Sequence, residues 1–290
     1  MNYIYFILGI VLLAFVIFSF RFSWWRKDIS YSYPRVLMYH MVSEHLEKDK
    51  SKFNRLRVKP EEFEKQLKWL KDNNWTSFTL SELVSLKEIP QKSVVITFDD
   101  GYEDNFKNAY PLLKKYGFKA TIYIVLNRFN QDWATDKDLN QASNELNSEK
   151  MLSNEQIKEM LDSGLIEIGS HTLDHVNLPK LTKDEKEKQI IESQKQIEEI
   201  FNIKCTSFAY PFGFFDNQDV EILKNSSYTN ATTVVNGVYD KTKYSDFLIP
   251  RIMISGRQNM YSFILKMQKG QSRWISVILP VLQNMVGLKK

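Results

Sequence analysis

From Arg35 onward, short apolar runs alternate with helix-like segments, and this alternation restricts the fold more than any other feature. Repeated strand–helix units are typical of α/β proteins with a parallel sheet. The predicted strands are RVLMY (35–39), SVVITF (93–98), KATIYIV (119–125), LIEIG (165–169), CTSFA (205–209), YTNATTVV (228–235) and IPRIMI (249–254). Helices are predicted over 60–74, 105–117, 153–164 and 182–202. We therefore expect one (β/α) barrel-like domain rather than two domains.

Two of the predicted helices open with a capping box, a hydroxyl followed three residues later by a glutamine or glutamate. The pairs are Ser153 with Gln156 and Thr182 with Glu185. The strand–helix pattern lapses over residues 127–150, which are polar and aperiodic. A loop of this length in a compact domain is more often functional or an insertion than a plain connection.

The first residues predict a membrane anchor. Tyr3–Phe20 is an uncharged stretch of eighteen residues, near the length that crosses a bilayer, and Trp24 and Trp25 follow it. A cleaved signal peptide has a shorter apolar core and a small-residue cleavage site, so we favour a retained anchor over residues 1–27.

Basic residues are concentrated at the two ends of the chain, although its formal net charge is only +4. Residues 257–290 form a basic, partly apolar tail, which suits either a membrane interface or a terminal helix that packs on the barrel. Nucleic-acid binding has little support, because the positive charge is not spread over a central surface. The basic residues after the apolar stretch favour a cytoplasmic domain by the positive-inside tendency; they are Arg21, Arg26 and Lys27.

Polar residues follow three of the predicted strands. His40 follows the first strand, Asp99 and Asp100 follow the second, and His171 follows the strand at 165–169. In α/β barrels the carboxyl ends of the strands meet at one face, where the site is built. We expect these residues, far apart in sequence, to meet there.

The stretch HTLDH places His171 and His175 four residues apart, a spacing that can direct two imidazoles to one metal ion. Two neighbouring carboxylates in a water-poor cleft would repel each other unless a cation separates their roles. A metal on Asp100 would leave Asp99 as a base. The alternative is that these carboxylates cap the next helix and that the histidine spacing is incidental.

Two other reactive side chains carry less information. His45 lies in a charged loop and is expected to be merely solvated. Cys205 is the single cysteine, so no intrachain disulfide is possible and the redox compartment cannot be deduced from it.

TFDDG together with HTLDH resembles the metal-dependent polysaccharide deacetylases, the NodB-homology group or carbohydrate esterase family 4. The resemblance covers Arg35–Ile254 and implies a distorted (β/α) barrel with a catalytic domain over residues 28–256. It also implies that Asp99 is the general base and that the metal ligands are Asp100, His171 and His175.

FAYPFG resembles the next motif of the family, in which the backbone amide at the position of Tyr210 helps to hold the oxyanion. Many members carry an arginine at the position of Ala209, and many carry a general-acid histidine near the carboxyl end. This chain has neither, since no histidine follows His175.

Replacements for both groups are suggested by a branch of the family that acts on poly-β-1,6-N-acetylglucosamine. LMYHMV resembles its amino-terminal histidine motif, so His40 would protonate the leaving amine. IPRIMI resembles a second sequence of that branch, in which Arg251 would form charge-assisted hydrogen bonds to Asp99. An ordinary surface ion pair is the alternative for Arg251.

We therefore expect a membrane-anchored N-deacetylase acting on an N-acetylated amino sugar of a surface polysaccharide or a lipid-linked glycan. Its divalent metal would be Zn²⁺, with Co²⁺ or Ni²⁺ as alternatives. The family outweighs the flanking charges and places the domain on the extracytoplasmic side. A peptidoglycan or chitooligosaccharide deacetylase is the alternative enzyme, and a non-catalytic envelope scaffold or carbohydrate-binding protein is the alternative of another class.

Overall fold

The strands form a closed ring. The computed structural model describes residues 2–22, 24–47, 51–129, 133–138 and 141–270. Around the ring run β1 (Arg35–Tyr39), β5 (Ser93–Phe98), β6 (Ala120–Ile124), β7 (Ile166–Ser170), β8 (Ser207–Ala209), β9 (Asn230–Asn236) and β10 (Ile249–Met253). Because β1 pairs with both β5 and β10, the sheet has no open edge at this point. The predicted barrel is thus confirmed as a parallel seven-stranded barrel.

All neighbouring strands of the ring are parallel. Parallel strands of a barrel are covered on both faces, and therefore they read as continuous apolar runs rather than alternating ones. Every residue of β1 and β5 is buried, in agreement with RVLMY and SVVITF. Each predicted strand lies within two residues of an observed one.

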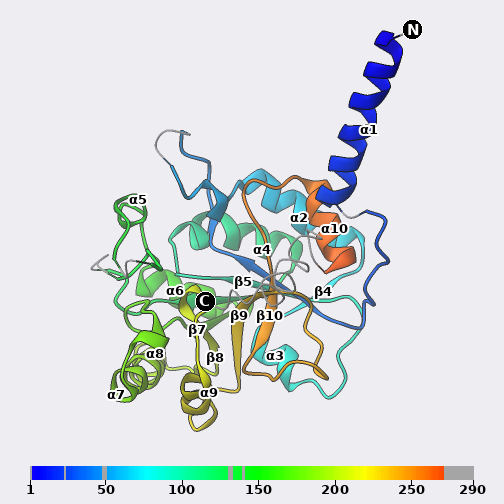
Figure 1. The fold of residues 1–290 in the computed structure, drawn as a ribbon. Helices are drawn as coiled ribbons and strands as arrows, with labels where there is room; N and C mark the ends of the chain where they lie inside the picture. Colours follow the sequence, from blue (N-terminus) through cyan, green and yellow to red (C-terminus); the bar gives the residue numbers. More distant parts are fainter. Residues whose placement is uncertain (1, 23, 48–50, 130–132, 139–140, 271–290) are drawn as a thin grey trace. The chain divides into compact units, whose positions relative to one another are not determined.

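Helices surround the barrel (Figure 1). The predicted capping boxes are confirmed at Ser153–Gln156 and Thr182–Glu185, and the helix that follows the second box contains a π-helical turn at Lys188–Glu192. The helices are α2 (Pro60–Asp72), α4 (Tyr110–Tyr116), α6 (Asn154–Asp162), α7 (Lys183–Glu187), α8 (Ser193–Phe201) and α9 (Asn217–Lys224), together with the short α5 (Asn144–Asn147) inside the predicted long loop.

Some elements were not predicted. The short strand β4 (Thr76–Phe78) pairs with the first half of β5, and the small pair β2 (Met41–Val42) and β3 (Arg57–Val58) lies outside the ring. Helix α3 (Leu80–Ser85) begins with a capping box and buries Leu80 and Leu83 among side chains of the barrel core. It carries too few residues to show a helical period.

The two ends of the chain form a unit separate from the barrel unit Tyr31–Gln258. Helix α10 (Met260–Lys269) is tied to the amino-terminal segment by an ion pair of 2.6 Å between Lys269 and Asp28. Helix α1 (Asn2–Phe22) covers the predicted span. In the part of the chain that is described, however, no helix has the length and apolar character needed to cross a membrane, so the predicted transmembrane anchor is not supported. Most of the predicted basic tail lies outside the described residues.

Candidate active site

A pocket of about 300 Å³ lies where the carboxyl ends of several barrel strands meet. Most of the residues predicted to form the site contribute to its lining, as expected for residues at the carboxyl ends of barrel strands. These residues are His40, Asp99, Asp100, His171, His175 and Tyr210. Arg251 lies on β10 and reaches the site through Asp99.

Arg251 and Asp99 form a buried, two-pronged ion pair. The guanidinium donates at 2.6 and 2.8 Å to the two carboxylate oxygens, and it also donates to the Thr97 hydroxyl and the Thr233 carbonyl. Arg251 is 1% exposed, which excludes the surface ion pair considered from the sequence. Burial alone would raise the pKa of Asp99, but the charge and hydrogen bonds of Arg251 outweigh it and lower this pKa to about 2.

Asp100, His171 and His175 form a compact group of possible metal ligands. The Nε2 atoms of both imidazoles lie 3.5 Å from Oδ1 of Asp100, and the two ring centroids are 4.7 Å apart. One ligand atom from each residue lies within 4.8 Å of the others. All three side chains are buried. The group could therefore hold one metal ion.

Backbone carbonyls orient both imidazoles. Nδ1 of His171 lies 2.7 Å from the carbonyl of Ala209, and Nδ1 of His175 contacts the carbonyl of Ala134. A carbonyl can only accept, so each Nδ1 must carry the proton, which leaves a lone pair on each neutral Nε2. Burial, and for His171 also the charge on His175, lowers the pKa of each imidazole to about 4 and favours this neutral form.

The neutral imidazoles thus turn two lone pairs toward a carboxylate oxygen. These three electron-rich atoms repel one another unless a cation lies among them. A carboxylate and two histidines that are held by hydrogen bonds to their other nitrogens form a donor set typical of a zinc site with an open position. The residues present therefore fit a divalent metal.

The backbone at the site is strained. Asp100, Thr172, His175 and Phe212 all have positive φ, at 75°, 70°, 51° and 57°. Such conformations cost about 1–3 kcal/mol each in residues other than glycine and are found mainly at functional sites. Gly101 follows Asp100 with a φ of 80°, where glycine meets no such penalty. The chain turns sharply to present its ligands at this edge.

His40 and Tyr210 lie at the pocket in different ways. His40 is half-buried, and its backbone carbonyl accepts a hydrogen bond from Asn105 at 2.9 Å. The backbone amide of Tyr210 donates to the Thr232 carbonyl at 3.2 Å, and the Tyr210 hydroxyl donates to the Phe247 carbonyl. The amide predicted to hold an oxyanion is thus engaged in the contact between β8 and β9, and its catalytic role stays a prediction.

Several pocket residues were not predicted. Trp133 and Phe212 pack edge-on against His175, with ring centroids 5.2 and 4.4 Å away. Trp133 and the Ala134 carbonyl come from the stretch 127–150, where the polar, aperiodic sequence indicated a functional loop but gave no reason to choose among its residues. His45 does not line the pocket, but it is half-buried and lies 3.0 Å from the Arg57 carbonyl rather than being merely solvated as predicted.

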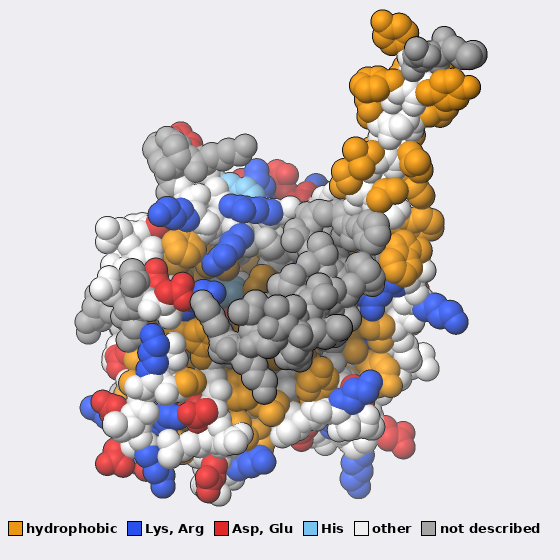
Figure 2. All heavy atoms as spheres, viewed as in Figure 1, with side chains coloured by type: hydrophobic (Ala, Val, Ile, Leu, Met, Phe, Trp, Pro, Cys, Tyr) orange, Lys and Arg blue, Asp and Glu red, His pale blue; other side chains and the backbone are white. Residues whose placement is uncertain are grey.

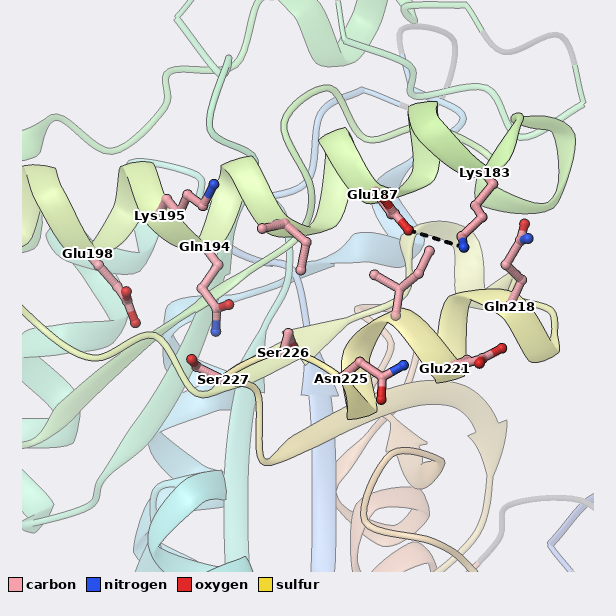
Figure 3. Close-up of a pocket in the computed structure, with 12 residues that line it drawn as sticks. Lys183, Glu187, Gln194, Lys195, Glu198, Gln218, Glu221, Asn225, Ser226 and Ser227 are labelled. Carbon is pink, nitrogen blue, oxygen red and sulfur yellow. Dashed lines mark ion pairs between the residues drawn. The ribbon is translucent and has the colours of Figure 1, made fainter.

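A larger pocket of about 430 Å³ lies between the α7–α8 segment and α9 (Figure 3). Lysine, glutamate and amide side chains point into it, and Lys183 lies 3.7 Å from Glu187. Its described lining contains neither histidine nor an aromatic ring. The pocket at the strand ends is therefore the candidate active site.

Comparison with known proteins agrees with this assignment. Residues 87–231 match the profile of the polysaccharide deacetylases. YxkH of Bacillus subtilis, which is classed with these enzymes, is 32% identical over 237 residues, which make up 80% of this chain and 75% of that protein. The chain belongs to the polysaccharide deacetylase family. It is therefore a hydrolase of the carbohydrate deacetylase type, and the non-catalytic alternative is not supported.

Two further relatives connect the sequence with the fold. The poly-β-1,6-N-acetyl-D-glucosamine N-deacetylase of Staphylococcus aureus is 31% identical over 209 residues, 68% of each chain. BC0361, a polysaccharide deacetylase from Bacillus cereus, is 28% identical to this chain in sequence. Its crystal structure matches with a TM-score of 0.68 over 81% of this chain and 69% of that one. The resemblance inferred from TFDDG and HTLDH is confirmed.

Proposed function

We propose that this deacetylase is a metal-dependent N-deacetylase that hydrolyses the acetamide of an N-acetylated amino sugar in a surface polysaccharide or a lipid-linked glycan. The observation that carries the proposal is the pair of neutral imidazoles whose Nε2 atoms lie 3.5 Å from the Asp100 carboxylate, beside a second carboxylate held by Arg251. The Staphylococcus aureus relative supports the choice of an N-acetylated sugar.

Asp100, His171 and His175 would hold the metal, and Zn²⁺ is the ion that a carboxylate and two imidazoles favour. When bound, a divalent ion supplies a Lewis acid that polarises the acetamide carbonyl and makes water more acidic. The two Nδ1 hydrogen bonds keep the ligand atoms directed toward one point before the ion arrives.

Asp99 is proposed as the general base. With a pKa of about 2 it stays ionised at neutral pH, and Arg251 fixes its orientation through both oxygens. Each oxygen keeps a second lone pair that can accept a proton from water. His40, at the rim of the same pocket, is proposed to donate a proton to the nitrogen of the departing amine, because an amide nitrogen leaves readily only when protonated.

The test is acetate release from N-acetylated glucosamine oligomers by the zinc-loaded protein. Wild type should release acetate, and His171→Ala should not, because it lacks one of the three ligands. His45→Ala is the matched control, since His45 does not line the pocket. Full activity in His171→Ala would refute the proposed site.

A His40→Ala variant separates the acid from the metal site. It should keep its zinc while losing turnover, more so for substrates with a poorer leaving amine. Unchanged turnover would remove His40 from the mechanism and leave the metal site standing.

We also propose that the catalytic domain acts outside the cytoplasm, because its proposed substrates are built into the cell surface. Protease accessibility of the domain in intact cells tests this location. A domain protected until the cells are broken would contradict it.

A further inference from the structure

Two cationic side chains, Arg55 and Lys137, line the candidate active-site pocket and are exposed to solvent. Arg55 belongs to a short turn before β3, and its guanidinium lies 5.9 Å from the ring centroid of Phe53, another lining residue. Lys137 comes from the long loop after β6. Figure 2 shows Lys and Arg side chains gathered beside histidine side chains on the viewed face.

Neither cation has an ionic partner within the described part of the chain. Two glutamates of the same long loop pair with Arg57 instead. Glu149 lies 2.7 Å and Glu145 3.6 Å from the Arg57 guanidinium, and Oδ1 of Asp136 accepts a hydrogen bond from the amide of residue 138. None of these acids lines the pocket.

The charges inside the pocket do not account for these cations either. The charge of Asp99 is balanced by Arg251, and that of Asp100 belongs to the proposed ligand set. A neutral acetamide needs no further positive charge to bind. Its hydrolysis releases acetate and leaves on the glycan an ammonium group, which Arg55 and Lys137 would repel. A neutral glycan that becomes a polycation therefore matches this pocket poorly.

We propose that Arg55 and Lys137 bind an anionic substituent, a carboxylate or a phosphate, that the glycan carries next to the acetamide to be cleaved. Guanidinium and ammonium groups at the rim of a pocket form charge-assisted hydrogen bonds with both kinds of anion. This inference rests on the proposed function and refines it, since an acidic glycan becomes the preferred substrate. Arg55 and Lys137 would then determine substrate specificity.

The experiment compares substrates that differ only in charge. One pair is the disaccharide of N-acetylglucosamine and N-acetylmuramic acid and its methyl ester, in which the carboxylate is masked. The other is di-N-acetylchitobiose with and without a 6-phosphate. The zinc-loaded wild type should favour the charged member of at least one pair by about tenfold in kcat/KM, chiefly through KM. The pair that shows the preference identifies the anion.

Variants assign the preference to the two residues. Arg55→Gln with Lys137→Gln should abolish the preference by raising KM for the charged member. The exposed Lys52→Gln, a residue that does not line the pocket, should change neither. A wild type that prefers neither charged member, or a double variant that keeps the preference, overturns the inference.

Loss of the proposed function gives a different result. If no compound releases acetate, the deacetylase proposal fails, and titration calorimetry with the same compounds decides the inference by itself. Tighter binding of a charged member that disappears in the double variant supports it, and equal binding of both members overturns it.

Discussion

Two carboxylates at opposite ends of the barrel have opposite surroundings: the half-buried Glu167 at the amino end is bound by donors of the chain, whereas the buried Asp100 at the carboxyl end faces two imidazoles. Glu167, near the start of β7, accepts hydrogen bonds from the Leu80 amide at 3.0 Å and the Thr121 hydroxyl at 2.7 Å. The same oxygen is 3.3 Å from the Ser81 amide. These two amides begin α3, where a negative charge is favourable.

A network of neutral side chains extends this arrangement. The hydroxyls of Ser81 and Thr206 are hydrogen-bonded at 2.8 Å. The Ser81 hydroxyl also accepts a hydrogen bond from the side-chain amide of Asn230 at 3.0 Å. Donors and acceptors at the amino end are therefore paired, and this end stabilises the fold.

At the carboxyl end, Asp100 itself has a positive φ, and its carboxylate faces the lone pairs of two imidazoles. The proposed metal ion would complete the surroundings of Asp100 from outside the chain. A buried carboxylate therefore indicates a functional site where the neighbouring atoms, here two Nε2 atoms, carry no proton to donate to it.

The sharpest test exchanges one carboxylate at each end. Asp100→Asn should lose bound zinc and lower acetate release by at least about 10³-fold, because an amide is a poor ligand for zinc. Glu167→Gln should keep both. Metal analysis and initial rates measure the two effects, and equal losses in the two variants would remove the distinction between the ends.

Arg251→Met should give the largest loss of stability. It leaves the buried Asp99 without its partner, which costs about 3–5 kcal/mol in unfolding free energy. The exposed Arg257→Met, measured by the same urea denaturation, is the control and should change it little. If the two arginine variants are equally stable, the buried pair does not stabilise the domain.

The two histidines should make the stability of the metal-free protein depend on pH. Their pKa is about 4 when folded and near 6.5 when unfolded, so the unfolded chain takes up protons first as the pH falls. Stability is then lost below pH 6.5, by about 1–2 kcal/mol per imidazole between pH 7 and pH 5.

Urea denaturation in chelator at the two pH values measures this loss. The variant with His171→Asn and His175→Asn should show a flatter dependence, whereas His45→Asn should follow wild type. A double variant as steep as wild type would place the titrating groups elsewhere.

Glu167→Gln should show the smallest effect. Loss of the charge at the first amides of α3 should cost about 1–3 kcal/mol in unfolding free energy, while kcat stays within about twofold of wild type. A drop in kcat without loss of stability would mean that the two ends are coupled.

Local sequence predicts a large part of this molecule. The buried strands are continuous apolar runs, and Asp99, Asp100 and His171 come directly after such runs, so barrel geometry alone brings them together. Short elements escape this reasoning. Helix α3 is held by Glu167, 87 residues from Leu80, and no local pattern contains that contact.

The site shows the same division. The pairing of Arg251 with Asp99 spans 152 residues and was expected only by resemblance to a family branch. The carbonyls of Ala209 and Ala134 that set the imidazole tautomers are backbone atoms, and residue identity does not indicate them. Arg55 and Lys137 were not predicted, because the sequence does not indicate which charged loop residues lie beside the pocket.

Titration of Zn²⁺ into metal-free protein by calorimetry tests most directly whether Asp100, His171 and His175 form a metal site. Wild type and His45→Asn should bind one ion per chain, and the variant with His171→Asn and His175→Asn should bind none at this site. Wild-type protein that binds no ion, or a double variant that binds it as tightly as wild type, would show that these residues do not hold a metal.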